Sequence, residues 1–191
     1  KAEEYLQIAL EANEAMPERD LAEPFLIDIY ENLAFVYFKK NSHEQGHAYA
    51  KKALDSISKI YGENDVRSVA LLRDLAYSFY GHEKFDDALI YAKKLNDTLK
   101  KTPEADKNEV TQSLVLIGKI YTKKNDSSTA VEYGQKALKV CSESGHDLYW
   151  LEQIHSLLGT ALFIGGKEVE GLKHFEEAAE LCEESGDKSG N

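Results

Sequence analysis

The sequence predicts an all-α protein in which pairs of helices repeat along the chain. Its 191 residues are 42% apolar and 30% charged, and only 12 Gly and 3 Pro interrupt them, which favours long helices over a turn-rich β fold. Internal repetition is the second observation. The twelve residues that begin at Lys136 match those that begin at Glu177, with Ala, Cys, Glu, Ser and Gly at equivalent places. A repeat period of about 20 to 50 residues is typical of stacked, modular folds.

The repeat extends along the chain as four full units. One set of equivalent residues, the core ladder, has intervals of 42, 42 and 41 residues, and an Ala or Gly follows each member; it consists of Leu33, Leu75, Ile117 and Leu158. The second ladder has the same intervals and consists of Tyr37, Phe79, Tyr121 and Leu162. Within each unit, apolar residues recur three and four positions apart, as on one face of a helix. Each unit is therefore predicted to contain two amphipathic helices.

Turn-forming residues divide the chain between the predicted helices. Such stretches include Asn41-Ser42 and Gly165-Gly166, and the three prolines Pro17, Pro24 and Pro103 lie in or beside junctions, where a missing N–H costs little. Residues 2–9 match the second helix of the following unit. The chain therefore begins with a second helix, and the first helix of that unit is absent from the sequence. This, together with the end of the chain where a fifth unit would begin, indicates a segment of a longer protein. We expect one domain over residues 1–191, with about nine helices in units at about 1–16 (partial), 22–62, 65–102, 104–145 and 147–186.

The recurring residues resemble the tetratricopeptide repeat. Leu-Ala or a similar pair is followed by an aromatic or apolar residue and then by two small residues, the second of which is replaced by Leu95 in one unit, as in the L-G-x₂-Y and A-x₃-F pattern of that family. The units are longer than the usual repeat of about 34 residues by roughly two helical turns. In this length they are similar to the repeats of kinesin light chains. Residues 60–66 resemble the linker of those repeats, and residues 74–76 resemble their N-L-A stretch. The resemblance implies an α-solenoid, a right-handed superhelix of stacked antiparallel helix pairs.

Charge and apolar patterning exclude two classes of partner. With 34 acidic and 23 basic residues the net charge is −11, which repels nucleic-acid phosphates and anionic lipids. The longest apolar run, LAFVYF at residues 33–38, is far shorter than the ~20 residues of a membrane span. Cys141 and Cys182 are expected to be free thiols, which suits the cytoplasm or another reducing intracellular compartment. We expect a protein or peptide ligand, and neither nucleic acid nor membrane.

The resemblance implies that the first helices of the units line a concave groove that holds a peptide. Asn32 has the donor and acceptor needed to bond a peptide backbone, and Tyr77 and Tyr80 offer the rigid area typical of binding hot spots. We expect Asn32, Tyr77, Tyr80 and Lys119 to converge in the middle of this groove. The alternative is that the aromatic residues pack between neighbouring first helices. The predicted peptide-binding residues are Asn32, Phe35, Lys39, Arg73, Asp74, Tyr77, Tyr80, Gln112, Lys119 and Lys123, and Phe38, Leu116, Leu157 and Thr160 are expected on the same surface.

The predicted function is a non-catalytic scaffold or adaptor that binds a peptide segment of a partner protein. An alternative is a peptide-sensing regulatory domain, because similar repeats form the pheromone receptors of Gram-positive bacteria. A minor alternative is a zinc hydrolase, because His43-Glu44-Gln45-Gly46-His47 reads H-E-x-x-H.

The repeat register predicts that these histidines pack rather than bind zinc. His43 is equivalent to Phe85, and His47 is equivalent to Leu89, Val131 and Leu172. His174 likewise stands where other units have tyrosine and is expected to pack, and the histidines outside the H-E-x-x-H stretch do not cluster in the sequence. We therefore expect no catalytic residue, no cofactor and no bound metal.

Overall fold

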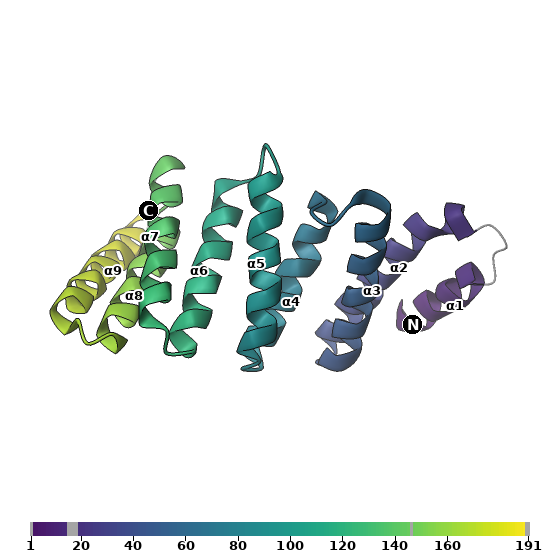
Figure 1. Ribbon diagram of the computed structural model, residues 1–191, viewed down its shortest axis with the longest axis horizontal. Coiled ribbons are helices and arrows are strands. Elements are labelled where there is room, and N and C mark those ends of the chain that lie inside the picture. The colour runs from purple at the N-terminus through teal and green to yellow at the C-terminus, as the bar shows by residue number, and fades with distance from the viewer. Residues whose placement is uncertain (1, 15–18, 146, 190–191) are drawn as a thin grey trace.

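The computed structural model is all-α and describes residues 2–14, 19–145 and 147–189 (Figure 1). Within these ranges it contains nine α-helices and one short 3-10 helix, η1, which confirms the predicted fold class. The elements are α1 (Ala2–Glu14), α2 (Arg19–Lys39), α3 (His43–Tyr61), η1 (Val66–Ser68), α4 (Val69–Gly81), α5 (Phe85–Lys101), α6 (Lys107–Lys123), α7 (Ser127–Glu143), α8 (Leu148–Ile164) and α9 (Glu168–Ser189).

The prolines show where the predicted junctions differ from the observed ones. Pro103 follows α5, as predicted, and Pro17 lies outside the described residues. Pro24, however, lies inside α2, which begins five residues earlier, at Arg19. Pro24 is the sixth residue of α2, just beyond the first turn, so its missing N–H removes one backbone hydrogen bond near the start of the helix.

The helices form antiparallel pairs, α2/α3, α4/α5, α6/α7 and α8/α9, and each pair packs against the next. The core ladder lies at the centre of this packing. Its four members are each at most 1% exposed, and the alanines or glycines that follow them are also buried. Burial of one leucine side chain stabilises a fold by about 1.5–3 kcal/mol. The periodicity of the sequence therefore predicted the core correctly.

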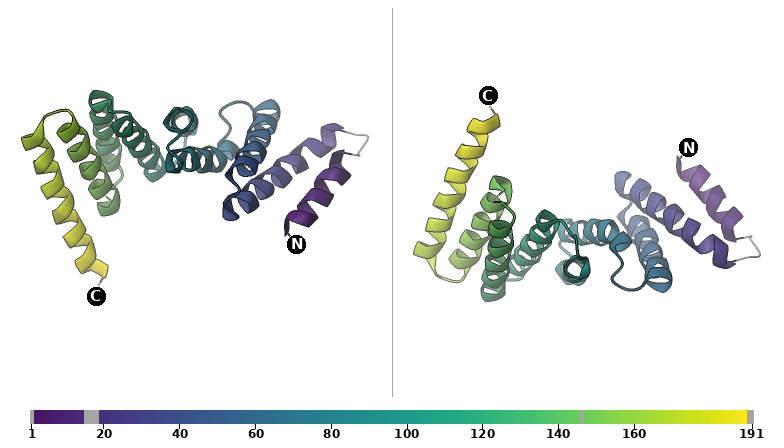
Figure 2. Two further views of the ribbon diagram at one scale, coloured as in Figure 1. Left: turned by 90° about the horizontal axis from the view of Figure 1, so that it is seen from below. Right: turned by 90° about the horizontal axis from the view of Figure 1, so that it is seen from above.

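The stack of helices is curved. In the two views of Figure 2, α5 lies on the outer side and both ends of the stack bend away from it. The first helices α4 and α6 lie toward the inner side in these views. Neither these nor any other helix within the described ranges is long and apolar enough to cross a membrane. Cys141 on α7 and Cys182 on α9 are free thiols, as predicted.

The turn that joins the two helices of each unit has the same backbone geometry four times. Asn41, Glu83 and Asn125 have a φ of 58°, and the equivalent Gly166 has a φ of 78°. The residue after each of them donates its N–H to the carbonyl of the second-ladder residue of that unit, at 2.9–3.0 Å. Positive φ is the left-handed region, which glycine and asparagine adopt more readily than glutamate. Glu83 is thus the least suited residue of the four.

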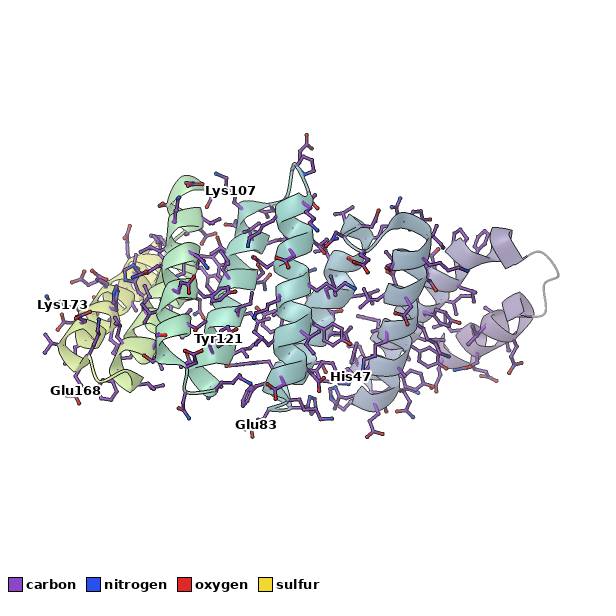
Figure 3. All side chains as sticks on the ribbon, viewed as in Figure 1. His47, Glu83, Lys107, Tyr121, Glu168 and Lys173 are labelled. Carbon is purple, nitrogen blue, oxygen red and sulfur yellow. The ribbon has the colours of Figure 1, made fainter. Side chains whose placement is uncertain are left out.

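We expect Glu83→Asn to raise the free energy of unfolding by about 0.5–1 kcal/mol, because asparagine adopts the left-handed region at lower cost. Glu83 sits in the turn next to α5 and its side chain is exposed (Figure 3), so the change removes no buried contact. The reciprocal change, Asn125→Glu, should lower the same quantity by a similar amount. Urea unfolding followed by circular dichroism measures both, and equal stability of all three proteins would contradict this account of the turn.

Candidate functional site

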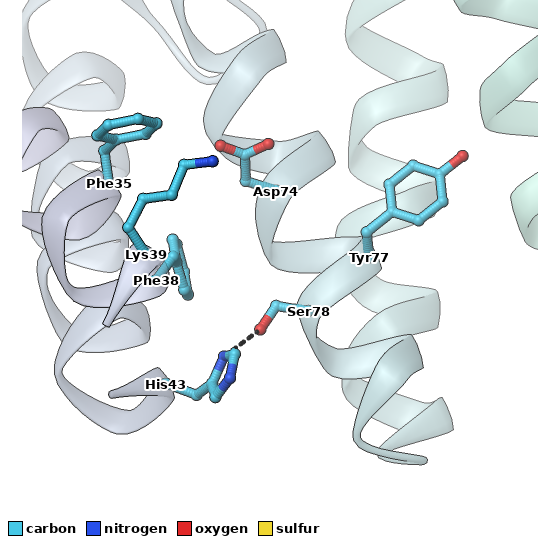
Figure 4. Close-up of a pocket in the computed structure, with 7 residues that line it drawn as sticks. All are labelled: Phe35, Phe38, Lys39, His43, Asp74, Tyr77 and Ser78. Carbon is cyan, nitrogen blue, oxygen red and sulfur yellow. Dashed lines mark hydrogen bonds between the residues drawn. The ribbon is translucent and has the colours of Figure 1, made fainter. Parts of the chain in front are cut away.

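A pocket of about 430 Å³ opens between α2 and α4 (Figure 4). Its walls come from the two first helices, with one residue from the start of α3. The lining residues are Phe35, Phe38, Lys39, His43, Asp74, Tyr77 and Ser78. Four of the ten predicted peptide-binding residues, Phe35, Lys39, Asp74 and Tyr77, therefore share one pocket.

The α2 wall combines an exposed aromatic ring with a positive charge. Phe35 and Lys39 are one helical turn apart, and the Lys39 Nζ lies 5.4 Å from the centre of the Phe35 ring. The Phe35 side chain remains 56% exposed, although it is large and apolar. In Figure 4 the Lys39 ammonium group points across the pocket toward Asp74. The wall therefore offers both an apolar and a cationic contact to a ligand.

The α4 wall carries Asp74 and Tyr77. Partial burial raises the pKa of the Asp74 carboxyl, and the neighbouring Arg73 opposes the shift. Burial also raises the pKa of the Tyr77 hydroxyl, while a hydrogen bond with Gln112 opposes that shift. The Tyr77 ring points away from Phe35 and Lys39 (Figure 4) and is 40% exposed. Tyr77 therefore forms the edge of the pocket rather than its centre.

The histidines of the H-E-x-x-H stretch hold α3 against α4 at the floor of the pocket. The His47 Nε2 lies 2.9 Å from the Ser78 Oγ, and the His43 Nδ1 lies 3.3 Å from the same oxygen. The His47 ring stacks on Phe79 with 4.0 Å between ring centres. Burial, together with nearby positive groups, lowers the pKa of His47 to about 4. His47 thus packs as predicted, whereas His43 packs and also lines the pocket.

A second pocket of about 220 Å³ lies where α4, α6 and α8 meet. The Lys119 Nζ donates a hydrogen bond to Gln153 Oε1 at 2.7 Å, and burial lowers the pKa of the lysine while Glu152 opposes the shift. Lys123 is exposed at the margin. The residues that line this pocket are Tyr80, Lys119, Thr122, Lys123, Ser156, Leu157 and Thr160.

The remaining three predicted residues line neither pocket. The Asn32 side-chain amide donates to the Asp28 carbonyl of its own helix at 2.7 Å. The Arg73 Nη1 donates to Glu109 Oε1 at 2.7 Å, which ties α4 to α6. Gln112 is half-buried and lies close enough to Tyr77 to oppose the rise in the pKa of its hydroxyl.

The four residues that were expected to converge in mid-groove do not line one common pocket. Tyr77 lines the first pocket, Tyr80 and Lys119 line the second, and Asn32 lines neither. The reason is that the two pockets lie between different pairs of first helices, while the sequence register places all first helices on one common surface.

Four lining residues were missed by sequence reasoning: His43, Ser78, Thr122 and Ser156. Ser78 could have been predicted from the sequence, because it lies one turn after Asp74 on the same helix face. His43 could not have been predicted in this way, because its place at the pocket depends on how the start of α3 packs against α4.

These two pockets, on a curved stack of paired helices, define a helical-repeat protein of the solenoid class. Residues 25–95 match the family model of the tetratricopeptide repeat. Residues 25–95 are thus a tetratricopeptide repeat region, and the fold of the chain is similar to that of kinesin light chain-like repeats.

Solved structures extend the likeness over nearly the whole chain. BtubC (BKLC) from P. vanneervenii superposes with a TM-score of 0.80 at 20% identity, over 97% of this chain and 73% of that one. The apo form of RapI gives 0.76 at 19% identity, over 96% of this chain and 64% of that one. A putative kinesin light chain with nearly identical repeats from Podospora anserina gives 0.75 at 14% identity, over 97% and 87%. At these identities the likeness shows the fold alone. A search of curated proteins gives no match.

We expect His47→Leu to change how stability depends on pH. The pKa of His47 is about 4 in the folded state, against about 6.5 in an unfolded chain, so only the unfolded state takes up the proton between these values. The stabilising contribution of neutral His47 is therefore complete above about pH 6.5 and is lost as the pH falls toward 4. The shift sets an upper limit of roughly 3 kcal/mol, which solvent screening of a partly exposed ring reduces to about 1–2 kcal/mol.

Urea unfolding at about pH 7 and pH 4.5 measures this difference. The wild-type protein should lose more stability than His47→Leu on acidification. At neutral pH the variant should be as stable as the wild type or more so, because Leu, Val and Leu stand at the equivalent positions of other units. If both proteins lost the same stability on acidification, His47 would not be the group responsible for the pH dependence.

Proposed function

We propose that this domain is a non-catalytic interaction module that binds a peptide segment of a partner protein along its first helices. The observation that carries the proposal is the pocket between α2 and α4, where Phe35 is 56% exposed beside Lys39 and Asp74. The match of residues 25–95 to the tetratricopeptide repeat supports it, since such repeats serve generally as protein interaction modules.

The pocket suits the side chain of a bound segment. Its volume of about 430 Å³ lies in the range of about 300–1,000 Å³ typical of ligand sites. An apolar side chain inserted against Phe35 would remove its ring from water, and each Å² of apolar surface buried contributes about 25 cal/mol. Lys39 and Asp74, on opposite walls, provide a donor and an acceptor for the polar groups of the same segment.

The second pocket favours a negatively charged group on that segment. Lys119 is half-buried with the neutral Gln153 as its hydrogen-bond acceptor, and Lys123 stands beside it. Both lysines line the same pocket in a chain whose net charge is −11. A carboxylate seated there would gain a charge-assisted hydrogen bond, while the acidic surroundings would disfavour acidic segments elsewhere.

The test uses peptides selected from a random phage-displayed library on the immobilised domain. Fluorescence anisotropy then gives the affinity of the best peptide for each variant. We expect Phe35→Ala to weaken binding about 10- to 30-fold, which corresponds to about 1.4–2 kcal/mol for an aromatic hot spot. The matched control is Ile90→Ala on α5, because Ile90 is also apolar and is 61% exposed, but lies outside both pockets.

Thermal midpoints must accompany the affinities, since a partly buried residue such as Tyr77 contributes to packing as well. Both Phe35→Ala and Ile90→Ala should keep midpoints close to the wild type, because both side chains are exposed. If no peptide is enriched, or if Ile90→Ala abolishes binding while Phe35→Ala leaves it intact, the proposed site is wrong.

A further inference from the structure

Two histidines and a glutamate come together between the last two helices. The Nδ1 atoms of His155 on α8 and His174 on α9 are 3.1 Å apart. The Glu177 Oε2 lies 2.5 Å from the first and 3.0 Å from the second. Across the described part of the chain, this is the one group of three or more His, Cys, Asp or Glu side chains whose ligand atoms lie within 4.8 Å of one another. The three residues are called the His-His-Glu cluster below.

Two glycines place the backbones close enough for this cluster to form. Gly171 on α9 lies against Gly159 on α8, and a Cβ atom added to Gly171 would stand 2.9 Å from the Gly159 carbonyl oxygen. Gly159 is one turn after His155, and Gly171 is one turn before His174. The imidazole rings therefore meet directly beside the point of closest approach, with 5.1 Å between their centres.

The same positions in the three preceding units carry different chemistry. The equivalents of His155 are Tyr30, Leu72 and Leu114, those of His174 are Tyr49, Tyr91 and Tyr133, and those of Glu177 are Lys52, Lys94 and Lys136. In two of those units the lysine lies over the tyrosine ring, at 5.3 Å for Lys52 and 4.7 Å for Lys136. The last unit alone replaces a cation over an aromatic ring with a carboxylate beside two imidazoles.

The three contacts of the cluster cannot all be hydrogen bonds at once. Each contact joins two atoms that carry lone pairs, so each needs a hydrogen between them to be attractive. A neutral imidazole carries one N–H, and if both histidines place it on Nδ1 to donate to Glu177, the two N–H groups face each other at 3.1 Å. A cation placed between the three atoms would be attracted to all of the lone pairs at once.

We propose that the His-His-Glu cluster binds one divalent transition-metal ion, of which Zn²⁺ is the natural probe. Imidazole and carboxylate are common zinc ligands, with bonds of about 2.0–2.2 Å. A tetrahedron with such bonds has edges of about 3.3 Å. Two of the three observed separations, 3.1 and 3.0 Å, lie near this length, and rotation of the Glu177 side chain, which is 52% exposed, lengthens the third.

The metal would join α9 to α8. The histidine side chains are 14% and 27% exposed and the Glu177 side chain is 52% exposed, so a bound ion would lie at the protein surface, with Glu177 on its solvent side. This proposal is independent of peptide binding and departs from the sequence-based expectation of no metal. That expectation rested on the absence of a histidine cluster in the sequence and on packing of His174, whereas the fold brings His155 and His174, 19 residues apart, together.

The test is a zinc titration of the tag-free, chelator-treated protein by isothermal calorimetry. We expect one zinc ion per chain. We also expect the thermal midpoint to rise by on the order of 5 °C at a hundredfold excess of zinc over the dissociation constant. Glu177→Gln keeps the shape of the side chain and should lower the affinity at least about tenfold, the smallest loss that even outer-shell changes at zinc sites produce.

A second variant, His174→Tyr, restores the residue that the other three units carry and should fold while it loses zinc binding. The control is His47→Leu, which removes another partly buried histidine and should keep full zinc binding. The proposal is overturned if the wild type binds zinc no more tightly than Glu177→Gln and His174→Tyr, or if His47→Leu is the variant that loses the metal. Circular dichroism confirms that each variant is folded.

Discussion

Each helix pair of this protein buries its apolar face against the neighbouring pair, and the other features of the structure depend on that constraint. The core ladder, at most 1% exposed in all four units, is the result. Because every unit must present the same two surfaces to its neighbours, the sequence repeats with a nearly constant interval. The turns repeat for the same reason, since a helix pair with a different turn would place its second helix off the stack. Asn41, Glu83, Asn125 and Gly166 share positive φ although only two residue types among them favour it.

The size of the side chains that pack between neighbouring first helices determines where a pocket forms on the inner surface. Between α6 and α8, Leu157 lies on Gly118, where an added Cβ would stand 2.5 Å from the leucine Cδ2, and the two helices pack directly. The equivalent residues between α2 and α4 are Asp74 and Ala34. A carboxylate keeps its contact with water and the alanine has a methyl group where the glycine has none, so the first helices there leave the larger pocket. The pocket is thus a local departure from the packing that holds the rest of the stack together.

The repeat period of the sequence predicted the features that recur in every unit. The helix pairs and the buried ladders follow from the spacing of residues along each helix. The shared pocket of Phe35, Lys39, Asp74 and Tyr77 follows from the equivalence of α2 and α4 in the repeat. Sequence reasoning failed where the outcome depends on contacts between helices. Asn32 bonds its own helix, His43 reaches the pocket through the junction of α3 with α4, and His155 meets His174 only because two glycines let α8 and α9 approach. The repeat register identifies which residues are equivalent. The distance between two helices, however, depends on every side chain that packs between them.

In a repeat protein the other units act as an internal reference for each position. A residue that departs from its equivalents, and fits packing less well than they do, lowers stability unless it makes some other contact. Asp74 stands where Leu116 and Leu157 are almost fully buried, and partial burial raises its carboxyl pKa, so its charge is held at a cost. His174 and Glu177 stand where tyrosine and lysine form a stabilising contact elsewhere. The two departures lie in different parts of the stack, one beside the pocket between α2 and α4 and the other between α8 and α9. Each therefore gives up packing at a place where the structure offers an external ligand a specific set of partners.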